Sequence, residues 1–118
     1  MPANRDEFFA EIAKPLAKKV VSYAGKEYLL QQMNEETGAE FELMLQSKKG
    51  FDMHKYRRCM ISMMLVDSEG NRLVDDESKL KGMSRAFAGF LFHECTELDG
   101  YKSGEVEELI KNSEPVEG

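Results

Sequence analysis

The sequence predicts an α+β fold, a small single domain that is mainly helical with a short β-hairpin near the N-terminus. Hydrophobic residues alternate between residues 17 and 32, as in strands, and recur every three to four residues after Met33, as in helices. The chain has 118 residues, of which 42% are hydrophobic and 32% are charged, as in ordinary globular proteins. We expect one globular domain over residues 1–111 and a flexible acidic tail over residues 112–118.

Capping and breaking residues define the N-terminal elements. Asn4 precedes acidic residues and an apolar pattern at helical spacing, so a short helix is expected to begin there and to end at Pro15. The apolar positions of this helix are Phe8, Phe9, Ile12 and Ala13. A β-hairpin is expected from Ala17 to Gln32, with its reversal at Gly25, because glycine adopts a positive φ without strain.

The middle of the chain predicts two helices. Asn34 should cap the first, and the Lys48-Lys49-Gly50 step should end it with cations in the last turn and a glycine beyond. The second should begin near Asp52 and form the central helix of the core, because its apolar face is broad. That face comprises Met53, Tyr56, Cys59, Met60, Met63, Met64 and Leu65.

Turns and helices alternate in the remainder of the chain. The Gly70-Asn71 pair between apolar flanks indicates a tight turn and is compatible with a second, very short hairpin. A turn of helix should follow as far as Leu80, and a long apolar helix should then cover Met83 to Leu98. Gly104 should open a last short helix.

Charge, hydropathy and cysteine content limit the classes of function. A formal net charge of -6 repels a phosphate backbone, so we expect no nucleic acid partner. Local basic groups, among them Lys55, Arg57 and Arg58, are interpreted as solvated faces. No segment approaches the roughly 20 apolar residues of a membrane span, so we expect no membrane association. The two cysteines, Cys59 and Cys95, are expected as reduced thiols in a cytosol.

Three groups of residues could carry chemistry, and each lacks a part that the chemistry needs. The acidic turn from Asp67 onward does not place its glycine or a glutamate where a calcium-binding EF-hand requires them. His93, Cys95 and Cys59 offer zinc-ligand atoms without a paired spacing, and no third residue orients a Cys–His nucleophile. We therefore expect no metal, no cofactor and no catalytic residue, and a protein that is not an enzyme.

Residues 57–80 read RRCMISMMLVDSEGNRLVDDESKL, an apolar helix that runs into a Leu-Val-Asp-x-Glu-Gly-Asn-Arg-Leu turn and then an acidic segment. This succession resembles the tail assembly chaperones of long-tailed, lambda-like siphophages. The resemblance covers about residues 8–100 and includes the Ala13-Lys14-Pro15 element, the short hairpin and the Glu40-Phe41-Glu42 step. Residues 75–82 depart from it, because they are more polar and basic than the family pattern.

The resemblance implies a non-catalytic chaperone that acts in virion morphogenesis in the host cytoplasm and is absent from the finished particle. It also implies two partners. The chaperone binds the long, hydrophobic tape measure protein, and it helps to recruit subunits of the tail tube protein. Such proteins are often also made in a longer, frameshifted form. The alternatives are a small cytosolic regulatory or antitoxin-like protein-interaction domain, or a small enzyme with an unrecognised site.

The two most apolar helices are expected around Met53 to Leu65 and around Phe87 to Leu98. They supply more apolar side chains than one core face needs. We therefore expect part of this supply, with the hairpin edge, to form a partner-binding surface, because methionine is flexible enough to adapt to many helical segments. The candidate partner-binding residues are Met60, Met63, Met64, Phe87, Phe90 and Phe92. The other interpretation is that both helices are buried on all sides, since stripes of Met and Phe are usually core.

Overall fold

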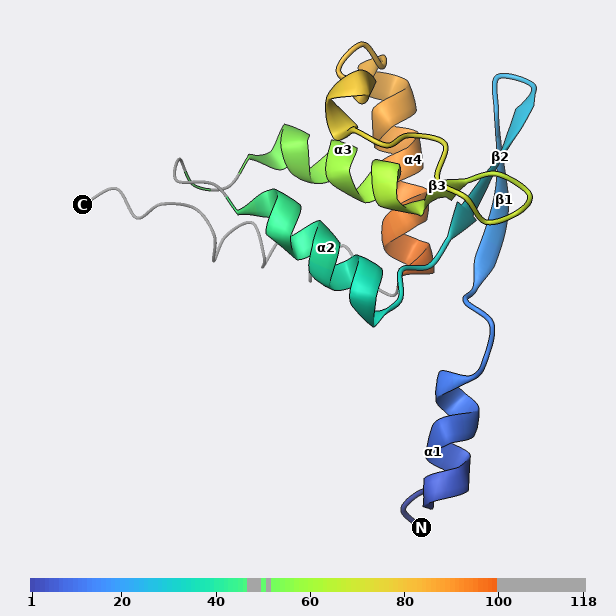
Figure 1. Cartoon of the computed structure of the whole chain (residues 1–118). Coiled ribbons are helices and arrows are strands. Elements are labelled where there is room, and N and C mark those ends of the chain that lie inside the picture. Colours follow the sequence, from blue (N-terminus) through green and yellow to red (C-terminus); the bar gives the residue numbers. More distant parts are fainter. Residues whose placement is uncertain (47–49, 51, 100–118) are drawn as a thin grey trace.

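The computed structural model describes residues 1–46, 50 and 52–99, and it has an α+β fold (Figure 1). In chain order its elements are α1 (Arg5–Ile12), β1 (Lys18–Tyr23), β2 (Lys26–Gln31), α2 (Glu35–Leu45), α3 (Met53–Met64), β3 (Leu65–Val66), the 3₁₀ helix η1 (Glu77–Leu80) and α4 (Arg85–Leu98). The three strands form an antiparallel sheet in the order β1-β2-β3. The predicted fold class is confirmed, including the hairpin near the N-terminus.

β1 and β2 form the predicted hairpin, whose register places Tyr23 opposite Lys26 at the tip. Gly25 has a φ of 79°, as expected, but Ala24 also has a positive φ, of 52°. Two successive residues with positive φ make the two-residue turn whose twist matches that of hairpin strands. Ala24 holds this conformation although a Cβ makes it unfavourable by about 1–2 kcal/mol.

α2 and α3 begin where their caps predict. The Asn34 side chain accepts a hydrogen bond from the Thr37 N–H at 2.8 Å, and the Thr37 hydroxyl accepts one from the Asn34 N–H at 2.8 Å. Asp52 caps α3 in the expected place. α2 ends earlier than predicted, at Leu45, because Gln46 is already extended; the lysines of the predicted end lie outside the described residues.

The segment after α3 pairs with β2, a contact that was not expected from the sequence. Leu65, assigned above to the helix, instead begins β3 and pairs with Leu30 of β2. The chain then reverses through Gly70, whose φ is 86°, and Val66 forms a bridge with Arg72. The second, very short hairpin is therefore present, and one of its arms extends the sheet.

η1 is the predicted turn of helix before Leu80, and Asp76 caps it. α4 begins at Arg85, two residues later than predicted, because the Ser84 hydroxyl caps the helix by accepting the Phe87 N–H at 3.1 Å. Within residues 1–46 and 52–99, no helix combines the length and the apolar character that a membrane span requires. The predicted last helix from Gly104 and the acidic tail lie outside the described residues, so the domain limit at residue 111 stays a prediction.

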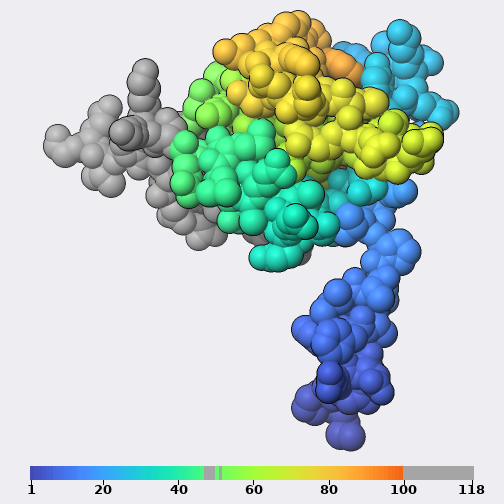
Figure 2. All heavy atoms as spheres, viewed as in Figure 1, coloured from blue at the N-terminus to red at the C-terminus, as the bar shows by residue number. Residues whose placement is uncertain are grey.

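α3 lies at the centre of the core, as predicted, and packs against α2, α4 and η1. Its buried residues are Tyr56, Cys59, Met60, Ile61, Ser62, Met63 and Met64. The sheet contributes Val21 and Leu30, and α4 contributes Leu91 and Cys95. α1 contributes no buried residue and extends away from the rest of the molecule (Figures 1 and 2).

Candidate interaction surface

The structure places four of the six candidate partner-binding residues in the core. Met60 and Met64 of α3 are 0% exposed, and Met63 is buried as well. Phe92 of α4 is buried against Tyr56 of α3, with 5.5 Å between the ring centroids. Their positions fit the interpretation of the apolar stripes as core, and their contribution to partner binding stays a prediction.

Phe87 and Phe90 of α4, the other two candidates, are half-buried and pack against the hairpin. The Tyr23 ring centroid lies 4.7 Å from that of Phe87 and 5.1 Å from that of Phe90. Tyr28 lies 5.3 Å from Phe87, again between centroids. We call these four rings the aromatic surface. The structure thus brings two of the six candidates together with the hairpin, where all four rings remain partly exposed.

A second apolar surface lies on α1. Phe8, Phe9 and Ile12 are 59%, 53% and 63% exposed. The two phenylalanine rings contact each other edge to face at 5.5 Å, and the Arg5 guanidinium lies 5.6 Å from the centroid of Phe9. These apolar positions were expected from the sequence, but their exposure to solvent was not. The sequence did contain a sign of this exposure, because acidic residues flank the three apolar positions and leave only a narrow apolar stripe on the helix.

A pocket of about 430 Å³ lies where the start of α3 meets η1 and the start of α4. It combines positively charged and apolar side chains, and we call it the basic pocket. Its lining residues are His54, Arg57, Arg58, Leu80, Lys81, Met83, Arg85 and Ala88. Arg57 and Arg58 were interpreted above as part of a solvated face, whereas the structure half-buries both.

The cations of the basic pocket are unequally neutralised. Arg58 donates a hydrogen bond from Nε to the Glu77 carboxylate at 2.7 Å. Arg57 lies with its guanidinium carbon 5.4 Å from the centroid of the Phe92 ring, and its buried Nε has no hydrogen-bond acceptor among the described residues. A buried donor of this kind is unfavourable until an acceptor reaches it. The lining of the pocket thus includes the cations Arg57, Arg58, Lys81 and Arg85, of which Arg58 is paired with Glu77.

The two thiols considered above for a zinc or nucleophilic site are both fully buried. Burial raises the pKa of the Cys59 thiol to about 11 and that of Cys95 to about 12. Both are therefore protonated at neutral pH, whereas metal binding and nucleophilic attack use the thiolate. His93 lies on the exposed side of α4. These residues act in this structure as small apolar core residues and a surface imidazole.

The structure groups His93 with Glu94 and Glu97, whose potential ligand atoms lie within 4.8 Å of one another. Lys19 of β1 already occupies this group, because its ammonium lies 2.5 Å from the Glu94 carboxylate and 3.7 Å from that of Glu97. The hydrogen bond to Glu94 raises the pKa of Lys19. A metal ion would have to displace this ammonium, so the group fits an ion pair that ties β1 to α4.

The acidic turn after β3 has internal partners for its first carboxylate. Asp67 accepts hydrogen bonds from the backbone N–H groups of Glu69 at 2.9 Å and of Asn71 at 3.0 Å. A carboxylate that accepts bonds from the following backbone is a common way to stabilise a tight turn. The arrangement therefore fits the interpretation of this segment as a turn.

The fold resembles that of a solved structure, the bacteriophage HK97 tail assembly chaperone. The TM-score is 0.51 and the sequence identity 15%, and the match covers 70% of this chain and 85% of the HK97 chain. No family model matches the sequence, and no curated protein matches it. At this identity the likeness concerns the fold. This chain thus shares its fold with a phage tail assembly chaperone, at a sequence identity of 15%.

Proposed function

We propose that this chain is a non-catalytic tail assembly chaperone, which binds a tape measure protein in the host cytoplasm and helps to recruit tail tube subunits. The observation that carries the proposal is the fold that it shares with the HK97 tail assembly chaperone over 70% of its length. The resemblance of residues 57–80 to the family supports the same proposal, mainly through the order of an apolar helix, a turn and an acidic segment.

We assign partner binding to the aromatic surface. Among the six candidates, Phe87 and Phe90 are the two whose rings lie partly in solvent, and Tyr23 and Tyr28 of the hairpin extend the same surface. Aromatic side chains contribute much of the binding energy in protein interfaces. An amphipathic helix of the partner would place its apolar side chains on these rings. The four buried candidates would then hold α3 and α4 in position beneath them.

Binding to each of the two tail proteins tests this proposal. The tagged chain is co-expressed with the tape measure protein, or with the tail tube protein, that is encoded beside its own gene. We expect capture of the tape measure protein and a loss of affinity of about tenfold or more in Phe90→Ser, the change expected when an interface residue worth about 1.4 kcal/mol is lost. Leu43→Ser is the matched control, because Leu43 is 66% exposed on α2, away from the aromatic surface.

The results separate the parts of the proposal. Binding of neither tail protein by the folded wild-type chain would contradict the chaperone function and favour the alternative, a regulatory protein-interaction domain. Binding of the tape measure protein with unchanged affinity in Phe90→Ser would retain the function and reject the aromatic surface. A thermal melt of each variant checks that loss of binding does not come from loss of fold.

A further inference from the structure

The basic pocket gathers positive charge on a chain whose formal net charge is -6. No carboxylate stands among its described lining residues, and Glu77 neutralises only Arg58 from beside it. Arg57, Lys81 and Arg85 form no ion pair with any residue that the structure describes. Like charges that are gathered in this way repel one another. An anion bound among them would relieve the repulsion.

The first turn of α4 adds to the positive charge of the pocket. The N-terminal end of a helix dipole is positive and favours acidic side chains, and α1, α2 and η1 all carry acids in their first turn. α4 instead begins with Arg85, has no acid in its first turn and is capped by the neutral Ser84. Arg85 is therefore unfavourable for the helix that it begins. Residues that oppose the stability of their own element are expected at functional sites.

The apolar part of the lining limits the class of anion. Leu80, Met83 and Ala88 supply this part, and all three remain partly exposed. A phosphate group offers nothing to pack on them, and no aromatic ring stands among the described lining residues to stack a nucleic acid base. A peptide whose carboxylates flank an apolar side chain matches both parts of the lining. The volume of about 430 Å³ is within the range of ligand sites.

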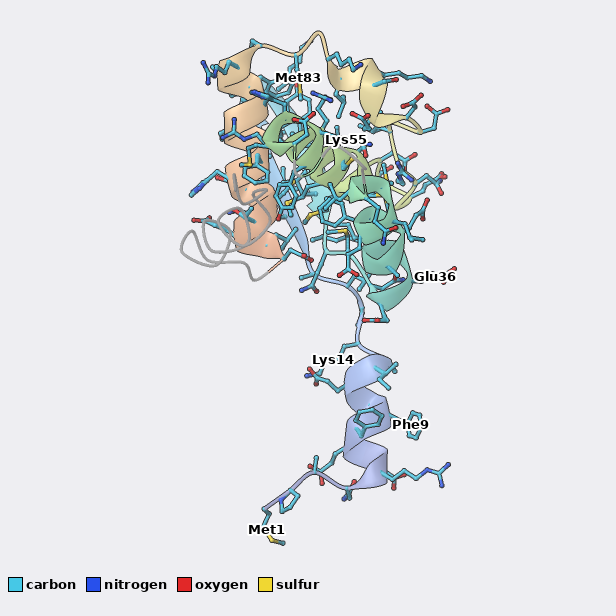
Figure 3. All side chains as sticks on the ribbon, turned by 90° about the vertical axis from the view of Figure 1, so that its left-hand side faces the viewer. Met1, Phe9, Lys14, Glu36, Lys55 and Met83 are labelled. Atoms are coloured by element: carbon cyan, nitrogen blue, oxygen red, sulfur yellow. The ribbon has the colours of Figure 1, made fainter. Side chains whose placement is uncertain are left out.

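The pocket is open and separate from the aromatic surface. Phe9 of α1 and Met83 of the lining lie at opposite ends of the molecule, so α1 does not cover the pocket (Figure 3). At 100° per residue, Arg85 and Ala88 share one side of α4, and Phe87 lies on a different side. A ligand can therefore occupy the pocket without contact with the aromatic surface.

We propose that the basic pocket binds an acidic peptide segment of a second protein, in which Asp or Glu side chains flank an apolar residue of about the size of leucine. The apolar residue packs on Leu80 and Met83. The carboxylates pair with Lys81 and Arg85, the two exposed cations of the lining that lack an ion pair. This binding does not depend on the proposed chaperone function, because it uses no residue of the aromatic surface.

Isothermal titration of the purified full-length chain with a synthetic peptide tests the proposal. The probe is Gly-Glu-Asp-Leu-Leu-Asp-Glu-Gly with both ends blocked, so that its only charges are the four carboxylates. We expect saturable binding that weakens as salt is added, because the ion pairs are screened. One control peptide replaces the acids by their amides, and another replaces both leucines by serine. Each control should bind about tenfold more weakly or worse, since each retains only half of the match.

Two other occupants are tested with the same chain. Inorganic phosphate and a short single-stranded oligothymidine should bind more weakly than the probe, and tighter binding of either would overturn the proposal. Residues 105–118 of the chain itself carry acids beside Val106 and Leu109. The full-length variant Glu107→Gln/Glu108→Gln should bind the probe like the wild type. Tighter binding by this variant would assign the pocket to the chain's own segment and overturn binding of a second protein.

Variants of the pocket give the decisive result. Arg85→Glu should abolish binding of the probe without lowering the melting temperature, because an acid suits the start of α4. Lys81→Glu provides a second test at an exposed position, and it should also lose binding. Lys26→Glu makes the same change of charge at the exposed tip of the hairpin, so it should bind like the wild type. A wild-type chain that does not bind the probe, undiminished binding by both pocket variants, or a lower melting temperature of Arg85→Glu would each overturn the proposal.

Discussion

Met64 fills the centre of the core from α3 and has no solvent-exposed area. We expect Met64→Ser to lower the free energy of unfolding by about 3 kcal/mol or more, because it leaves a cavity and buries a hydroxyl without a partner. Urea unfolding followed by far-UV circular dichroism measures this change. Leu43→Ser on the surface of α2 should change the same quantity by less than about 0.5 kcal/mol. Similar losses in both variants would contradict the burial of Met64.

Asp99 follows α4 and is a residue whose charge opposes folding. Burial raises the pKa of its carboxyl, although the Met33 N–H that donates to it acts in the other direction. When the pKa of an acidic group is raised in the folded state, the protein loses stability as pH rises from the unfolded pKa of that group, about 3.9, through its folded pKa. The negative charge also lies at the unfavourable end of the α4 dipole.

Asp99→Asn should therefore raise the melting temperature modestly at pH 7, because the amide keeps an acceptor for Met33 and removes the charge. The gain should disappear below about pH 4, where Asp99 is protonated. Glu36→Gln removes another carboxylate, but at the start of α2, where a negative charge is favourable, so it should not stabilise the fold. An advantage of Asp99→Asn that is independent of pH would exclude the charge as its cause.

At the scale of elements, local signals predicted where most helices and turns begin. The side chains of Asn34 and Ser84 cap their helices by accepting a hydrogen bond from the backbone N–H of the third following residue, and Gly25 lies in the turn of the hairpin. Both features can be inferred from a short stretch of sequence. The end of α2 and the strand at Leu65 were not predicted. β3 exists because the chain after α3 meets β2, and such a pairing of distant residues leaves no local pattern.

α1 is an element that the fold does not need. It has no buried residue, so deletion of residues 1–12 should leave the melting temperature of the dilute chain within about 2 °C of the full-length value. Deletion of residues 1–23 should unfold the chain, because it also removes β1 and buried Val21. Differential scanning calorimetry of both truncations checks this. A large loss of stability in the shorter deletion would show that α1 packs on its own domain.

At the scale of the whole molecule, the sequence predicted the fold class and the central position of α3, but not the surfaces. The basic pocket combines Arg57 with Lys81 and Arg85, which come from three segments of the chain. Each segment alone has the composition of a solvated face, so only the tertiary arrangement reveals their proximity. The same limit applied to the methionines of α3, whose pattern suits both a core and a binding groove.

β2 is paired on both sides, since Leu30 faces Lys19 of β1 and Leu65 of β3, and the Leu30 side chain is fully buried. At Leu29 and Leu30, the two positions that pair with both neighbouring strands, the backbone of β2 can therefore meet solvent only when the sheet separates and the core opens. In amide hydrogen exchange, we expect the protection of Leu30 to correspond to global unfolding, while the amides of α1 exchange at nearly the rate of an unstructured peptide. Exchange at Leu30 would thus report the stability of the whole molecule from one position.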